Sequence, residues 1–176
     1  MSEEDPHARF ERQMLPWLAD AYNLAFWLLK HDQDAQDAVQ EAYLRAFRFF
    51  DGCRVESPKP WLLGIVRNVC LDALAKRSRE RKVIPMNEQS FEVPDPAPWP
   101  SAELVRKSTL EAVRSALEDL PVEFRSVLLL REMEGLSYKE IAALTGLPLG
   151  TVMSRLARAR RQLSLALTQQ KAWEQP

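Results

Sequence analysis

The 176-residue chain has few of the residues that usually carry catalysis or covalent cross-links. Its only two cysteines, Cys53 and Cys70, form neither a disulfide framework nor a CxxC metal pair. Its two histidines, His7 and His31, lie in no HExxH or triad-like arrangement, and no glycine-rich phosphate loop is present. We therefore predict a protein that is not an enzyme and needs no cofactor or metal. Cys53 is expected to be a partly buried thiol rather than a redox switch.

Glycine and long apolar runs are also scarce. With five glycines, and apolar residues recurring at helical rather than alternating spacing, the chain is predicted to be all-α. The longest apolar stretch, around Trp61–Leu71, is interrupted by Arg67 and Asn68, and is shorter than the roughly 20 residues that cross a bilayer. The acidic start lacks the basic-then-apolar order of a signal peptide. These absences predict a soluble cytoplasmic protein.

The formal net charge of -1 hides a segregation of charge along the chain. Residues 1–50 are predominantly acidic, residues 51–82 are predominantly basic, and residues 149–161 contain four arginines and no acid. Two basic segments separated by acidic ones suggest two contacts with a polyanion such as nucleic acid. The alternative is that both are ordinary solvated helix faces.

Prolines divide the chain in two. The stretch from Ile84 to Pro100 contains five of the twelve prolines and no apolar period. Because proline fixes φ and removes a backbone donor, this stretch is predicted to be an extended linker. The expected organisation is a helical domain over 7–82, a linker over 83–100 and a second helical domain over 101–170.

In the first domain we expect a helix over Phe10–Lys30 that is interrupted near Pro16, a helix over Asp34–Phe50, and a helix from Trp61 to about Arg79. A loop over Asp51–Pro60 is predicted to precede this last helix. One apolar stripe at i, i+3, i+4, i+7 spacing marks the second helix: Ala35, Ala38, Val39, Ala42, Tyr43, Ala46, Phe47 and Phe50.

In the second domain Ser101 is a candidate N-cap for a helix to Leu120, and Pro121 begins the next helix, to Met133. Ser137 and Glu140 form a capping-box pattern before a short helix that ends at Gly146, and a final helix runs to about Leu167. The two last helices are expected to pack through Ile141, Ala142, Val152 and Leu156.

This pattern predicts a helix-turn-helix whose second helix presents Thr151, Ser154, Arg155 and Arg158 to the major groove. Arginine suits that position because it pairs bidentately with guanine or clamps phosphate. The alternative is a small helical hairpin with a solvated arginine face.

Several segments resemble those of a known family. Asp34–Phe47 and Pro60–Asn68 resemble the second conserved region of bacterial sigma factors, while Leu117–Pro121, Gly135–Ala142 and Gly150–Leu156 look like the fourth region. A chain with these two regions and a short linker is similar to the extracytoplasmic-function (ECF) subgroup.

The resemblance implies binding to core RNA polymerase and to promoter DNA. The polymerase-facing residues would be Asp37, Gln40, Glu41, Leu44, Arg45 and Arg48. Contacts with the −10 element would come from the loop 51–59 and from Trp61, Arg67, Asn68, Lys76 and Arg77, although Trp61 is also a candidate core residue. Contacts with the −35 element would come from Tyr138, Lys139, Thr151, Ser154, Arg155 and Arg158.

Two departures from the family pattern are visible. Met153 stands where many relatives have arginine, so we expect either that the −35 sequence read here differs or that this contact is absent. Pro58 and Pro60 are unusual for the loop that contacts the −10 element in the family. An anti-sigma factor is a further expected partner. Two other classes fit parts of the pattern: a helix-turn-helix regulator with a ligand-sensing first domain, and a decoy that titrates the partners of a sigma factor.

Overall fold

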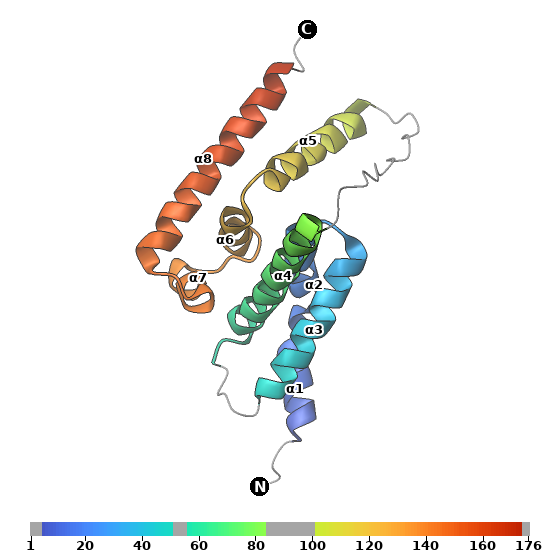
Figure 1. Ribbon diagram of the computed structural model, residues 1–176, viewed down its shortest axis with the longest axis vertical. Coiled ribbons are helices and arrows are strands. Elements are labelled where there is room, and N and C mark those ends of the chain that lie inside the picture. The colour runs from blue at the N-terminus through green and yellow to red at the C-terminus, as the bar shows by residue number, and fades with distance from the viewer. Residues whose placement is uncertain (1–4, 51–55, 84–100, 174–176) are drawn as a thin grey trace.

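Helices make up all the regular structure in the computed structural model, which describes residues 5–50, 56–83 and 101–173 (Figure 1). This confirms the predicted all-α class. The elements in chain order are α1 (Pro6–Met14), a 3-10 turn η1 (Leu15–Trp17), α2 (Leu18–Leu29), α3 (Asp32–Phe50), α4 (Pro58–Val83), α5 (Ser101–Glu118), α6 (Val122–Glu132), α7 (Tyr138–Thr145) and α8 (Leu149–Trp173). Cys53 and the predicted linker 84–100 lie outside the described residues. No helix in the described part of the chain combines the length and apolar character needed to span a bilayer.

The first helical segment is interrupted where the sequence predicted. Pro16 lies in the 3-10 turn between α1 and α2, and Lys30 ends α2 in the left-handed conformation, with a φ of 64°. The Asp5 side chain caps α1 by accepting a hydrogen bond from the His7 amide at 3.2 Å. Local signals therefore explain the start of α1 and the break at Pro16, whereas lysine has no preference for the left-handed conformation that ends α2.

Helix α3 buries the predicted apolar stripe, with two exceptions at its edge. Tyr43 is half-buried and donates a hydrogen bond to the Met14 carbonyl at 2.8 Å, while Phe47 is 38% exposed. The expectation that Phe47 is a core residue is therefore wrong. Its ring packs edge-on against Phe10, 5.2 Å between centroids, at the rim of the core.

Helix α4 begins earlier than predicted. The sequence placed Pro58 and Pro60 in a loop, but both lie in the first turn of α4. Proline is tolerated there because the first amides of a helix have no intrahelical acceptor. The prolines therefore initiate the helix, and the predicted loop is wrong for residues 58–60; its part 51–55 lies outside the described residues.

In the second half the ends of α6 follow their sequence signals, whereas the start of α5 and the end of α8 differ from the prediction. Pro121 precedes α6, whose end is followed by Gly135 with a φ of 68°, a conformation that favours glycine. Helix α5 starts at Ser101 itself, so this serine is the first helical residue. Helix α8 runs to Trp173, beyond the predicted end at Leu167.

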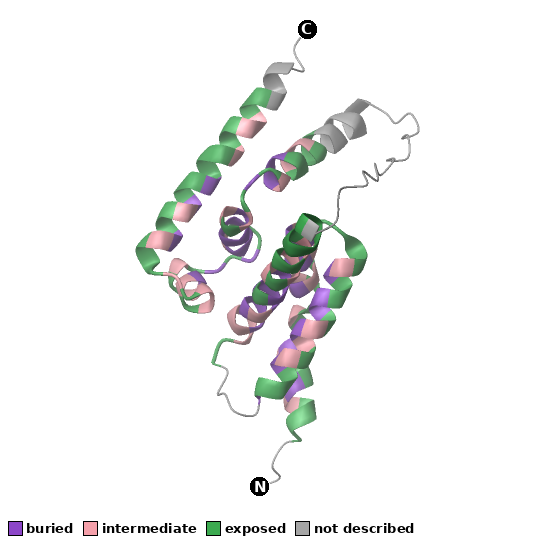
Figure 2. Ribbon diagram, in the orientation of Figure 1, coloured by how far each residue is buried: buried purple, intermediate pink, exposed green. Residues whose placement is uncertain are grey.

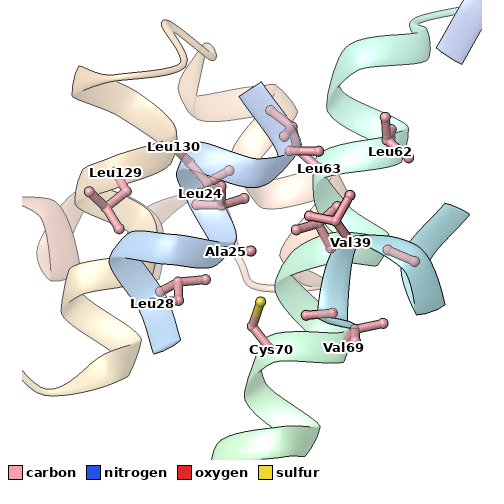
Figure 3. Packing of buried hydrophobic residues seen from close by; sticks show 14 of the residues in the cluster. Leu24, Ala25, Leu28, Val39, Leu62, Leu63, Val69, Cys70, Leu129 and Leu130 are labelled. Carbon is pink, nitrogen blue, oxygen red and sulfur yellow. The ribbon is translucent and has the colours of Figure 1, made fainter. Parts of the chain in front are cut away.

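The two halves share one hydrophobic core. Leu24 and Leu28 of α2 lie between α4 and Leu129 and Leu130 of α6, and Cys70 of α4 belongs to the same cluster (Figure 3). Burial is highest where the helices face one another, and the outer faces of α3 and α8 are largely exposed (Figure 2). The sequence had left the relative placement of the halves open. The structure packs them together.

Candidate nucleic-acid interface

Helices α7 and α8 form the helix-turn-helix that the sequence predicted. The Ser137 hydroxyl accepts from the Glu140 amide at 3.1 Å, and the Glu140 carboxylate accepts from the Ser137 amide at 2.7 Å. Gly146 ends α7 with a φ of 70°. This reciprocal capping box and the left-handed glycine fix both ends of α7 and so define the turn.

The packing between these helices determines which face of α8 is presented outward. Ile141, Val152 and Leu156 are fully or almost fully buried, whereas Ala142 is half-buried. A helix that buries these positions leaves its opposite side to solvent. Near the start of α8 that side carries the half-buried Thr151 and Arg155 and the exposed Met153, Ser154 and Arg158.

The arginines of α8 differ in how far their charges are already satisfied. Arg160 donates through two nitrogens to Glu132, at 2.6 and 2.9 Å. Arg155 and Arg158 form no ion pair with any residue in the described part of the chain. Their donors are therefore available to an external anion, such as a phosphate or a guanine edge.

At the start of α7 the two other candidates differ from each other. Lys139 is exposed, whereas Tyr138 is half-buried beneath the Arg131 guanidinium, 4.9 Å from the ring centroid. Hydrogen bonds to Glu132 and Tyr138 raise the pKa of Arg160. Tyr138 is thus held within the motif, and Lys139 points to solvent.

Helix α3 presents a polar face along the side away from the core. Asp37, Gln40, Arg48 and Leu44 are exposed, Leu44 by 50%. The half-buried Arg45 donates to Glu41 at 2.7 Å, and this hydrogen bond is the main cause of its raised pKa.

A surface groove of about 340 Å³ between α3 and α4 adjoins this face. It is lined by carboxylates and bases that include Asp34, Asp37, Glu41, Lys76 and Arg77. All six candidate polymerase contacts of α3 therefore lie at or near one face.

The candidate −10 residues of α4 do not form one open track. Asn68 and Lys76 are exposed, Arg77 pairs with Asp34, and Trp61 is half-buried against the core. Arg67 is only 6% exposed and its Nε donates to the Ser126 hydroxyl of α6 at 3.2 Å.

The surroundings of Arg67 are unusual for a cation. Burial lowers the pKa of Arg67, the nearby charge of Arg155 lowers it further, and Glu123 acts in the opposite direction. The residue expected to contact DNA is thus covered by the other half of its own chain.

Sequence reasoning missed the polar residues at this contact. Arg125, Ser126 and Glu134 are buried, and the half-buried Lys59 pairs with Glu134. A weak signal was present, because Arg125 lies in α6 only two residues before the apolar run that begins at Val127. A cation on a helix that is largely buried must meet a polar partner.

The remaining chemically active groups are few. Cys70 is a free, fully buried thiol whose pKa burial raises to about 12. Among the described residues no cluster of three or more His, Cys, Asp or Glu side chains could hold a metal ion.

Comparison with known proteins identifies the family. The model of Sigma-70 region 2 matches residues 13–80, and that of Sigma-70 region 4 matches residues 110–163. The RNA polymerase sigma-H factor of Pseudomonas aeruginosa is 35% identical over 145 residues, covering 78% of this chain and 75% of the relative. The ECF RNA polymerase sigma-E factor of Escherichia coli K12 is 35% identical over 141 residues, covering 74% and 72%. The chain belongs to the ECF sigma factors.

Other relatives extend this comparison. The ECF RNA polymerase sigma factor SigE of Mycolicibacterium smegmatis is 38% identical over 144 residues, and the chain spans 55% of its length. Among solved structures, the sigma factor RpoE of Bartonella quintana, in complex with the anti-sigma factor NepR, has a TM-score of 0.71 at 28% identity, covering 91% of this chain and 97% of RpoE. This ECF sigma factor thus has a known relative in which both halves superpose.

Proposed function

We propose that this ECF sigma factor binds core RNA polymerase and directs it to specific promoters. Family membership supports this, and so does the pairing of a polar α3 face with a helix-turn-helix on one chain. The observation that carries the DNA-binding role is that Arg155 and Arg158 lie on the outward side of α8 without ion-pair partners among the described residues.

The first half, residues 7–82, is proposed to bind the polymerase and the −10 element. On α3 the exposed Asp37, Gln40 and Leu44 flank the Glu41–Arg45 pair, a mixture of apolar and charged groups suited to a protein partner. On α4 the exposed Asn68 and Lys76 and the Arg77 side chain would follow single-stranded DNA, with Trp61 as a stacking surface.

The second half, residues 101–170, is proposed to read the −35 element. Thr151, Ser154, Arg155 and Arg158 occupy the N-terminal part of α8, which a helix-turn-helix inserts into the major groove. Tyr138 and Lys139 lie at the start of α7, where side chains reach the phosphate backbone. Met153, half exposed among them, cannot donate a hydrogen bond, and we expect it to offer apolar contact to a thymine methyl group.

The protein is proposed to act in the cytoplasm, where its polymerase is, and to have no catalytic activity and no cofactor of its own. An anti-sigma factor is a further proposed partner, since the relative RpoE of Bartonella quintana was solved with one.

The test is transcription by purified core RNA polymerase, with and without this protein, on a library of fragments from the source genome. Discrete start sites that appear only with the protein are expected. Tight sequence-specific DNA binding without polymerase, and no new start sites, would contradict the sigma function and favour a helix-turn-helix regulator.

Two paired variants separate the proposed roles. Arg155→Ala with Arg158→Ala should weaken promoter recognition by at least about 30-fold while preserving polymerase binding, because each base-reading arginine contributes about 1–3 kcal/mol and the two losses add. Glu41→Lys with Leu44→Ala should weaken polymerase binding and preserve binding to −35 DNA. Each variant is the control for the other, and circular dichroism confirms that both are folded. Equal loss of both activities in both folded variants would contradict this division.

A further inference from the structure

The start of α8 carries exposed apolar side chains at a regular spacing. Leu149 is 41% exposed and Met153 is 50% exposed, and the exposed Ala157 follows four residues later. Residues four apart lie on one side of a helix, so these three side chains form one strip of surface. The strip made by Leu149, Met153 and Ala157 is the apolar stripe of α8.

The apolar stripe takes no part in the packing that holds the helix-turn-helix together. Val152, Leu156 and Ala159 make the contact of α8 with the core, and all three are buried. At about 3.6 residues per turn the stripe lies beside this buried face rather than on it. Leu149 and Met153 therefore keep apolar surface in contact with water, and burial of that surface against a partner is favourable.

Small residues next to the stripe allow a partner to come close. A Cβ added at Gly150 would meet nothing within 4 Å, so the surface of α8 is open there. Ser154, one turn further along, is exposed, and its hydroxyl donates to the Thr151 carbonyl at 3.1 Å. Glycine and a short side chain turned onto its own helix leave little between the α8 backbone and a surface laid against it.

The available cations of α8 lie on the other side of these small residues. Arg158 is exposed and Arg155 is half-buried, and neither forms an ion pair with any residue in the described part of the chain. On the side of the stripe, Arg160 is already bound by Glu132 at 2.6 Å. The outward side of α8 therefore has a cationic flank suited to phosphate or guanine, and an apolar flank that donates no hydrogen bond.

The major groove of DNA offers one apolar group that matches the apolar flank. Among the four bases only thymine presents a methyl group there, at C5, and 5-methylcytosine presents the same group at the same position. Leu149 and Met153 are about 6 Å apart along the helix axis, at about 1.5 Å per residue, and base pairs are about 3.4 Å apart. The two side chains can therefore meet methyl groups on neighbouring base pairs.

We propose that the apolar stripe determines sequence specificity: Leu149 and Met153 bind the C5-methyl groups of two neighbouring pyrimidines in the −35 element. This inference rests on the DNA-binding role proposed above and adds the chemical group that the helix selects. The occupant is duplex DNA rather than a protein, because the stripe is continuous with the cationic flank on the outward side of a helix-turn-helix. Ala157 extends the strip with a methyl group of its own.

Removal of single methyl groups from the DNA tests the proposal. The probe is a duplex promoter identified with core RNA polymerase, in which each thymine of the −35 element is replaced in turn by deoxyuridine, which lacks only the methyl group. At each of two neighbouring thymines the replacement should weaken binding of the polymerase–sigma complex about fourfold, the effect of one buried carbon group. Replacement of thymines outside this pair should have little effect.

A second set of probes distinguishes the two sources of the methyl group. Where the −35 element has cytosine at either of these positions, replacement by 5-methylcytosine should strengthen binding about fourfold. Weaker binding with deoxyuridine identifies thymine as the base that is read. Stronger binding with 5-methylcytosine identifies a methylated cytosine, and either result supports the proposal.

Protein variants assign each methyl group to a side chain. In Met153→Ala the methyl replacement should have no effect at one of the two positions, and in Leu149→Ala it should have none at the other. Met153→Leu should preserve the dependence, because leucine and methionine have similar volumes. Met133→Ala is the matched control, since Met133 is 45% exposed but follows α6, and it should preserve both effects. All these positions are exposed, so the fold should be unchanged, which circular dichroism checks.

Three results would overturn the methyl recognition. The first is that no methyl replacement, at any thymine or cytosine of the element, changes binding. The second is an equal dependence on the methyl groups in the wild type, Leu149→Ala and Met153→Ala. The third is that these two variants lose polymerase binding and keep the DNA preference, which would make the stripe a protein-binding surface.

Failure of the sigma function would be seen separately. If core polymerase gives no new start sites with the wild type, the same methyl replacements are made in the duplex that the full chain alone selects from a random library. Methyl dependence there, lost in Met153→Ala, would support the recognition without the sigma function. Selection of no DNA by the full chain would refute both.

Discussion

Removing Lys59 should cost more stability than removing its carboxylate partner. Lys59→Met keeps the length of the side chain but removes the cation that Glu134 and Asp20 share. The Glu134 side chain is only 4% exposed, so water cannot replace this cation. Two unit charges at the observed 3.2 Å attract by about 5 kcal/mol at an effective dielectric constant of 20. Desolvation of both groups offsets much of this, and we expect Lys59→Met to lower the free energy of unfolding by about 2 kcal/mol.

The partner substitution should cost less. Glu134→Gln removes the buried negative charge and its repulsion with Asp20 but keeps an oxygen that accepts from Lys59. We expect a loss of about 1 kcal/mol or less. The double variant should then be more stable than Lys59→Met alone by about 1 kcal/mol, because it contains no unpaired buried carboxylate.

The pH dependence of Lys59→Met provides an independent check. Burial raises the pKa of Glu134, and Lys59 opposes this rise, so the pKa should rise further in the variant. Over the range between the ordinary glutamate pKa and the higher folded-state pKa, the folded chain holds a proton that the unfolded chain has lost. Raising the pH through this range therefore lowers the free energy of unfolding, by at most about 1.4 kcal/mol per pH unit. Glu134→Gln should remove this dependence.

Urea denaturation followed by tryptophan fluorescence, at pH values from 5 to 8, measures these free energies. The expected loss in Lys59→Met corresponds to a decrease in melting temperature of about 6 °C. A Lys59→Met chain within about 0.5 kcal/mol of the wild type at every pH would refute the ion pair as a stabilising contact. A double variant no more stable than Lys59→Met would refute the unpaired carboxylate as the cause.

Three other predictions follow from single residues. Cys70, with its pKa raised to about 12, should not react with iodoacetamide at pH 8 until urea unfolds the chain, and rapid native labelling would contradict its burial. Ser137→Ala should lower the free energy of unfolding by about 1 kcal/mol through loss of the capping box, whereas Ser137→Asp should restore most of it. Gly146→Ala should cost about 1–2 kcal/mol because φ is 70°, while Gly150→Ala should be neutral or stabilising; equal effects of the two alanines in thermal melts would contradict the left-handed C-cap.

Helix ends with short-range chemistry could be predicted from the sequence. The capping box at Ser137, the glycine at 146 and the proline before α6 each act within four residues, and the structure has all three where they were expected. The break near Pro16 is of the same kind. Such signals depend only on neighbours along the chain, so no tertiary information is needed.

Ends without a unique local signal were predicted less well. Pro58 and Pro60 fit either a loop or the first turn of a helix, and only the structure distinguishes the two. Helix α8 continues past Leu167 because no glycine or proline follows before Trp173. Phe47 has the spacing of a core residue, but its burial depends on how far the neighbouring α1 extends over it.

The sequence also predicted one part of the candidate site and missed another. The sequence predicted the helix-turn-helix and the polar face of α3, and the structure places the α8 candidates on the outward side of their helix and the α3 candidates at or near one face. Their roles in binding polymerase and DNA remain predictions. The sequence did not predict that Arg67 would be buried, because Ser126, which accepts its hydrogen bond, lies 59 positions away.

The sequence by itself therefore determined the helical class, the helix-turn-helix and the family, because apolar period, capping and motif spacing are all encoded within short segments. Only the tertiary structure decided how the halves meet. The partners there are 88 positions apart for Lys30 and Glu118, and 97 for Arg125 and Leu28. Lys30 and the buried Arg125 are stabilised by carbonyls at the ends of other helices, and carbonyls are present at every residue, so no pattern in the sequence marks these partners.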